Sequence, residues 1–123
     1  MMKRYISANL DYSNIPEENK NGDCFVVALN KFMTDPKRYT LVHGVVTGQG
    51  AIAGIQYCHA WVEDSNNVID MTLPTDMRVF PKDAYYAIGN IKITRKYDYR
   101  QVLENVCKYE TYGPWDKIFE RYY

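Results

Sequence analysis

The stretch QYCHAWVEDSNNVIDMTL, residues 56–73, predicts a β-hairpin at the centre of the fold. Its first eight residues are rich in β-branched and aromatic side chains, DSNN is typical of a tight turn, and VIDMTL has the composition of a returning strand. Alternation along the first strand puts Tyr57, His59 and Trp61 on one face and Cys58 on the other. The hairpin therefore decides which of these side chains can meet.

The register of this hairpin decides whether His59 can meet Asp70. If the turn is centred between Ser65 and Asn66, Trp61 faces Asp70, and Asp70 is then the diagonal neighbour of His59. A register shifted by two puts Asp70 directly opposite His59, whereas an odd-numbered loop puts the two side chains on opposite faces. An even-numbered turn thus predicts a His59–Asp70 pair.

Upstream, NGDCFVVALNKFM, residues 21–33, predicts an amphipathic helix over 22–33, which the following TDP segment ends. Cys24 lies in the first turn of this helix if Asn21 or Asp23 is the cap. There the unpaired backbone N–H groups and the positive end of the helix dipole favour a thiolate. Because a free thiol has a pKa of about 8.5, a nucleophilic cysteine also needs a basic partner.

The chain has two histidines that could be this partner. Asp70 would accept a hydrogen bond from one imidazole nitrogen of His59, fix its tautomer, and leave the other nitrogen for the Cys24 thiol. His43, in TLVHGVV, is instead expected to be a half-buried strand histidine. The pattern predicts a Cys24–His59–Asp70 triad, and the alternative is an inert core cysteine at position 24.

The remaining segments favour an α+β class and one domain over residues 1–123. We expect the helix that bears Cys24 to pack on a small antiparallel sheet. Further strands are predicted over 38–48 and 90–94, and further helices over 81–88 and 97–110. In the aromatic C-terminal tail, Trp115 and Phe119 are spaced by four, so we expect them to clamp the tail onto the core. An exposed partner-binding surface is the alternative for this tail.

The composition of the chain argues against several classes of function and of site. Fifteen basic residues balance fifteen acidic ones, which argues against nucleic-acid binding. The start of the chain lacks the apolar region of a signal peptide, and no stretch has the length of a membrane span, so a cytoplasmic protein without a membrane partner is expected. Three cysteines without a C-x-x-C pair argue against a disulfide framework or a structural zinc site. Cys58 and Cys107 are expected to be packing residues.

The order GDC at a helix start, a strand ending VVTG, then HAWVE and VIDMT resembles the transglutaminase-like branch of the papain-like cysteine proteinase superfamily. This resemblance makes Cys24 the nucleophile, His59 the base and Asp70 the orienting acid. Trp61 and Glu63 occupy the remaining positions of its H-A-W-x-E signature. The resemblance implies a papain-like fold.

The resemblance covers about residues 20–74. It implies a cysteine peptidase or related amide hydrolase that acts on a peptide or protein through a thioester, with no metal or other cofactor. Trp61 and Gln56 are expected to line the substrate cleft, and the loop at 48–54 is either a wall of that cleft or an ordinary surface loop. Two other functions stay open: a non-catalytic protein-binding module, and a small metal-binding protein that uses the three triad residues as ligands.

The donors that would stabilise an oxyanion are not given by the resemblance. Papain-like enzymes place a glutamine six residues before the nucleophile, where this chain has Glu18. The backbone N–H of Cys24 is one candidate donor, because a developing oxyanion needs donors aimed at it in advance. The side-chain amides that could add to it are those of Asn21, which we favour, Asn19 and Gln56.

Overall fold

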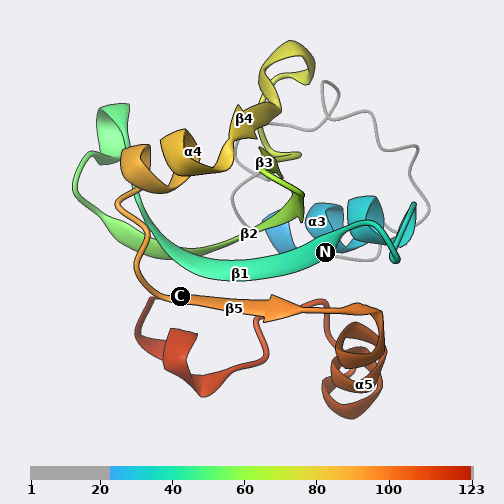
Figure 1. Cartoon of the computed structure of the whole chain (residues 1–123). Coiled ribbons are helices and arrows are strands. Elements are labelled where there is room, and N and C mark those ends of the chain that lie inside the picture. The colour runs from blue at the N-terminus through green and yellow to red at the C-terminus, as the bar shows by residue number, and fades with distance from the viewer. Residues whose placement is uncertain (1–22, 123) are drawn as a thin grey trace.

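The computed structural model describes residues 23–122, which form an α+β fold on a five-stranded antiparallel sheet (Figure 1). The strand order is β4-β3-β2-β1-β5. The strands are β1 (Thr40–Thr47), β2 (Gln56–Asp64), β3 (Asn67–Ile69), β4 (Val79–Pro81) and β5 (Thr94–Tyr97). The α-helices are α3 (Cys24–Met33), α4 (Lys82–Ile88) and α5 (Tyr99–Tyr109), and short 3₁₀ helices lie at Gly50–Ile52, Thr75–Met77 and Lys117–Tyr122. The predicted class, with the Cys24 helix packed on an antiparallel sheet, is confirmed.

The helix α3 begins at Cys24 and packs against β1 and β2. Six of its ten residues are buried, and their side chains form the apolar face that the sequence predicts. Asp23 is the N-cap residue, although its side chain makes no capping hydrogen bond. The helix ends at Met33, before the Asp35-Pro36 step, as the sequence predicts.

The hairpin of β2 and β3 has the first of the registers considered above. Asp64 pairs with Asn67, so Ser65 and Asn66 form a two-residue turn, and Ser65 has a φ of 55°. Positive φ at this position is typical of the turns that match the twist of paired strands. The prediction of a strand through residues 68–73 is wrong from Asp70 onward, because β3 ends at Ile69 and the chain then turns.

Both faces of the sheet are covered, each by different elements (Figure 1). On one face Leu41 and Ala60 pack with α3 and the C-terminal segment. On the other face Val42 and Trp61 pack with the tyrosines of α4. Glycine at position 44 leaves room for the Trp61 ring on this face, because a Cβ atom there would lie 2.5 Å from the ring. The central strands β1 and β2 therefore form a buried middle layer, whereas β4 and β5 at the edges are partly exposed.

In the second half of the chain, the helices predicted over 81–88 and 97–110 are confirmed, and one predicted strand is displaced. The strand predicted over 90–94 lies later, because β5 pairs with β1 only from Thr94 onward. The helix α5 begins with a capping box, in which Asp98 and Gln101 bond each other's backbone N–H groups. No helix within residues 23–122 has the length and apolar character needed to cross a membrane.

The C-terminal segment folds back onto the sheet (Figure 1). Trp115 and Phe119 are 7% and 0% exposed, and they belong to two different core clusters on the α3 face. Trp115 also donates its ring N–H to the carbonyl oxygen of Thr111 at 3.0 Å. Burial of both rings supports the clamp and not an exposed partner-binding surface formed by these two side chains.

Candidate active site

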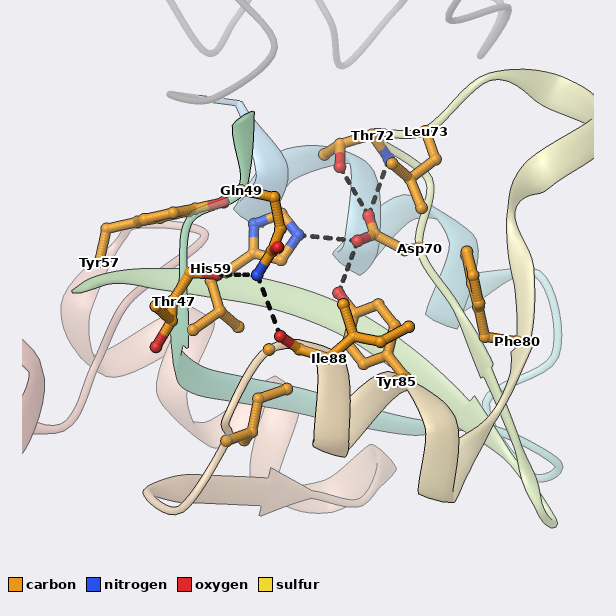
Figure 2. A pocket seen from close by; sticks show the side chains of 13 residues that line it. Thr47, Gln49, Tyr57, His59, Asp70, Thr72, Leu73, Phe80, Tyr85 and Ile88 are labelled. Atoms are coloured by element: carbon orange, nitrogen blue, oxygen red, sulfur yellow. Dashed lines mark hydrogen bonds and ion pairs between the residues drawn. The ribbon is translucent and has the colours of Figure 1, made fainter. Parts of the chain in front are cut away.

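His59 and Asp70 form a buried pair where the β2–β3 hairpin opens (Figure 2). His59 Nε2 lies 3.0 Å from Asp70 Oδ2, and the two side chains are 8% and 5% exposed. Continuing the observed pairing of Val62 with Ile69 by one step puts Trp61 opposite Asp70, so Asp70 is the diagonal neighbour of His59. The predicted proximity of the two side chains is confirmed.

Asp70 is held by further donors besides His59. Thr72 donates to Oδ1 from its backbone N–H at 3.0 Å and from its hydroxyl at 2.7 Å. Tyr85, on α4, donates its hydroxyl to Oδ2 at 2.6 Å. Burial raises the pKa of Asp70, but the charge of His59 and the hydrogen bonds from His59, Thr72 and Tyr85 outweigh it and lower the pKa to about 2. Asp70 is therefore ionised at neutral pH.

An ionised Asp70 fixes the tautomer of His59. Because the carboxylate can only accept, Nε2 must carry the proton that it donates, and Nδ1 is the nitrogen left to act as a base. Nδ1 is buried and makes no hydrogen bond with any of the described residues. The basic nitrogen is thus available to a neighbour.

That neighbour is Cys24, the first residue of α3. Burial lowers the pKa of His59, but the charges of Asp70 and Cys24 and the hydrogen bond to Asp70 outweigh burial, and they hold the pKa well above its ordinary value. Cys24 also lies at the helix end where backbone N–H groups lack helical partners and the dipole favours an anion. Cys24 thus lies close enough to His59 for its charge to act on the imidazole ring, and its own side chain is fully buried.

The signature residues Trp61 and Glu63 form a second buried network on the α4 side of the sheet. Trp61 donates its ring N–H to Glu63 Oε2 at 3.1 Å, and Tyr86 donates its hydroxyl to the same oxygen. Lys96 and Lys82 lie 3.1 and 3.4 Å from the other oxygen. Burial raises the pKa of Glu63, but these hydrogen bonds outweigh it and lower the pKa. The network anchors α4 and β5 to the strand that carries His59.

The expected cleft residues have other places in the structure. Trp61 is fully buried under α4, where its ring lies close to Gly44 of β1. It therefore lines no open surface. Gln56 is exposed at the beginning of β2, where it pairs with Thr47. Asn21, the favoured oxyanion donor, lies outside the described residues, as does Asn19. The backbone N–H of Cys24 remains the candidate donor within the described part.

A pocket of about 340 Å³ lies beside His59 and Asp70 (Figure 2). Strands β1 and β2, the segment from Thr72 to Phe80 and the helix α4 contribute its walls. From the loop at 48–54, Gln49 lines the pocket, and its side-chain amide donates to the carbonyl oxygens of Ile88 at 3.0 Å and Thr47 at 3.3 Å. The loop is thus a wall of the pocket at Gln49.

Sequence reasoning missed the contributions of Tyr85 and Gln49. Tyr85 lies in the predicted helix over 81–88, but nothing in that segment indicates which tyrosine turns toward Asp70. Gln49 lies in a glycine-rich loop whose path depends on the end of α4, more than thirty residues later. Both contacts are long-range, and only the three-dimensional arrangement of β2, the 70–80 segment and α4 creates them.

The two other cysteines and His43 differ in how well they match the expectations. Cys58 is buried, as expected, and burial together with the charge of Cys24 raises its pKa to about 12. Cys107 is exposed on α5, so its expected packing role is wrong; α5 buries Val102 instead. His43 is fully buried, where a half-buried position was expected.

Residues 23–122 contain no group of three or more His, Cys, Asp or Glu side chains that could hold a metal ion. Comparisons with protein-family models, with curated proteins and with solved structures found no match for this chain. The candidate function is therefore argued from the geometry of the site.

Proposed function

We propose that this protein is a cysteine-dependent acyl-transfer enzyme, a peptidase or related amide hydrolase with a papain-like fold of the transglutaminase-like branch. Cys24 is the nucleophile, His59 the acid–base group and Asp70 the orienting acid. One observation carries the proposal. A buried, ionised Asp70 lies 3.0 Å from Nε2 of His59, and Cys24, at the beginning of α3, is close enough for its charge to raise the pKa of the same imidazole ring.

In the first step the Cys24 thiolate attacks the carbonyl carbon of an amide. A sulfur–carbon bond forms and the carbonyl oxygen becomes an oxyanion, for which the backbone N–H of Cys24 is the candidate donor. His59 then gives the proton on Nδ1 to the leaving nitrogen, the carbon–nitrogen bond breaks, and an amine departs. Cys24 now carries the acyl group as a thioester.

In the second step a water molecule replaces the amine. Nδ1 of His59 takes a proton from the water, the hydroxide oxygen bonds to the thioester carbon, and the carbon–sulfur bond breaks. The products are a carboxylic acid and the starting pair of Cys24 and protonated His59. Asp70 stays ionised throughout and keeps the ring oriented, because its hydrogen bonds from Thr72 and Tyr85 leave it little freedom to rotate.

A non-catalytic binding module is the second candidate, and one observation favours it. The Cys24 side chain is fully buried, so no surface of its sulfur is open to a substrate in this structure. A fold that retained the triad for packing would hold the thiol in this way, and its pocket would bind a partner without reaction. Reactivity of Cys24 separates the two functions.

Iodoacetamide labelling near pH 7, followed by mass mapping of the alkylated peptide, tests the proposal. The experiment uses the full chain with Cys107→Ser, since Cys107 is exposed and would react whatever the site does. Cys58, with its raised pKa, is protonated near neutral pH and should react slowly. We expect Cys24 to be labelled first, because it lies at the beginning of α3 beside His59.

Asp70→Asn is the variant that tests the triad itself. The amide keeps the size of the side chain but favours the wrong imidazole tautomer, so labelling of Cys24 should slow by at least about tenfold. Asp64→Asn is the matched control, because Asp64 lies in the same hairpin but pairs with Arg38 on the surface. Absence of Cys24 labelling in the parent protein, with the fold intact, would favour the binding module.

A further inference from the structure

We propose that the pocket beside His59 and Asp70 selects an apolar, uncharged side chain of the substrate, so that the acyl group transferred to Cys24 comes from an aliphatic or aromatic amino-acid residue. This inference rests on the proposed function and adds its substrate class. It is carried by three features of the pocket: its size, its charge and the hydrogen bonding of Gln49.

The size of the pocket matches one residue of a substrate. Its volume of about 340 Å³ is at the lower end of the range of about 300–1,000 Å³ that is typical of small-molecule sites. Apolar side chains from four separate segments form much of the lining: Val46, Leu73, Phe80, Ile88 and Ile91. A single aliphatic or aromatic side chain can bury its surface there.

The charge of the lining excludes ionised side chains. Within residues 23–122, no lysine, arginine or glutamate lines the pocket, and its two ionisable groups of opposite sign, His59 and Asp70, are paired with each other. A charged side chain placed there would give up its water without gaining a partner. The pocket therefore discriminates against acidic and basic residues.

Gln49 suggests how the substrate backbone lies next to this side chain. The amide nitrogen of Gln49 donates to Ile88 O and Thr47 O, so both of its N–H bonds are used. Within residues 23–122 no donor bonds its carbonyl oxygen, and this acceptor beside the pocket fits the N–H of a peptide bond. The pocket thus matches an apolar residue within a peptide better than it matches a simple apolar ester.

The experiment compares the rates at which four probes alkylate Cys24 in the full chain carrying Cys107→Ser. The probes are N-acetyl amino-acid chloromethyl ketones with Leu, Gly, Glu and Lys side chains, each of which forms a bond from Cys24 Sγ to its methylene carbon while chloride leaves. Iodoacetamide, which has no side chain, measures the intrinsic reactivity of the thiol. We expect the Leu probe to react at least about tenfold faster than the Gly probe, since burial of a leucine side chain stabilises by roughly 1.5–3 kcal/mol. The Glu and Lys probes should be slower still.

A matched pair of variants then tests whether this pocket makes the selection. Ile88 lines the pocket and is 57% exposed, so Ile88→Lys should fold and should raise the rate of the Glu probe relative to the Leu probe. Ile55 is 55% exposed but lies outside the pocket, so Ile55→Lys should leave the relative rates unchanged.

Two results would overturn the inference, and they are distinguishable. Equal rates for the Leu and Gly probes, with normal iodoacetamide labelling of Cys24, would remove the selectivity and leave the proposed function intact. Failure of iodoacetamide to label Cys24 would remove the proposed function, and the inference with it. Equal effects of Ile88→Lys and Ile55→Lys would show that another surface selects the side chain.

Discussion

The two histidines lie on neighbouring strands of one sheet, yet their surroundings have opposite effects. His43, on β1, pairs with Ala60, and His59, on β2, pairs with Gly44, so their positions are one residue apart in the register. Alternation turns His43 toward α3 and His59 toward α4. His43 is 0% exposed and His59 is 6% exposed, so burial alone does not distinguish them.

Their neighbours do distinguish them. Four aromatic rings surround His43, with centroids 4.9–6.4 Å away: Phe25, Tyr97, Trp115 and Phe119. Neither of its ring nitrogens bonds a described residue, and burial lowers its pKa to about 3. His59 instead has a carboxylate and a thiol beside it, and its pKa is raised. A buried histidine is thus a candidate for chemistry only where a charged partner compensates for burial.

Removal of the C-terminal clamp should have the largest effect on stability. The clamp residues belong to the aromatic rings around His43. Deletion of residues 113–123 takes away Trp115 and Phe119, each worth about 3–5 kcal/mol when truncated in a core. This rivals the whole stability of a small domain, about 5–15 kcal/mol. We expect a largely unfolded or aggregated protein, measured by circular dichroism and thermal unfolding.

Tyr109→Ala is the control for that deletion, because Tyr109 is an aromatic residue near the same end but is 43% exposed. It should change the melting temperature by little. A truncated protein that melts cooperatively within a few degrees of the full chain would show that the rings around His43 do not hold the fold together. It would also raise the odds that the tail binds a partner.

The pH dependence of stability should separate the two histidines by sign. His43 has a folded pKa of about 3, below its unfolded value of about 6.5, so the unfolded chain binds the extra proton between these pH values. Its contribution to stability is therefore complete above pH 6.5 and falls by roughly 1.4 kcal/mol per pH unit toward pH 3. His59 has a raised pKa, so its contribution is present below pH 6.5 and is lost as the pH rises through the folded value.

His43→Leu tests this assignment, since leucine keeps an apolar side chain in the aromatic cage. Urea unfolding between pH 7 and pH 4 should show a steep loss of stability in the parent protein and a much flatter profile in the variant. Asp70, whose pKa is about 2, loses its contribution only at lower pH and does not obscure the comparison. An unchanged slope in His43→Leu would mean that another group controls the acid transition.

The same contrast shows how far the sequence could predict this site. The two-residue turn at Ser65 and Asn66 sets the hairpin register, and the register alone places His59 beside Asp70. These are local contacts, eleven residues apart, so alternation and turn length suffice to predict them. Cys24 at a helix start was predictable for the same reason.

What could not be predicted depends on elements that meet only in the folded chain. The aromatic cage of His43 comes from α3, β5 and the C-terminal segment, so its full burial has no local signal. The strand expected at 90–94 is displaced because β5 pairs with β1 only from Thr94 onward, and before it Ile93 only accepts one hydrogen bond from the Val45 N–H. Tyr85 bonds Asp70 across the sheet face, and no spacing rule links the two.

The smallest expected effect, and the one most specific to the His59 side, is that of Tyr85→Phe. The phenyl ring keeps the contacts with Trp61 and Phe80, whose ring centroids lie 5.3 and 5.8 Å away, while Asp70 loses one charge-assisted hydrogen bond. Such bonds contribute about 1.5–3 kcal/mol. The pKa of Asp70 should therefore rise, but Asp70 stays ionised at pH 7, so the rate of Cys24 alkylation at pH 7 should fall by less than about threefold, and the fall should grow as the pH is lowered toward the raised pKa of Asp70.

Tyr86→Phe is the matched control, because Tyr86 is the next residue of α4 and donates in the same way to the other buried carboxylate, Glu63. Both variants should lose similar stability, since each removes a tyrosine hydroxyl from a buried acid. Only Tyr85→Phe should move the alkylation profile, because Glu63 does not contact His59 among the described interactions. Equal shifts in the two variants would mean that α4 acts on the site through packing, and Tyr85 would then have no separate role in positioning Asp70.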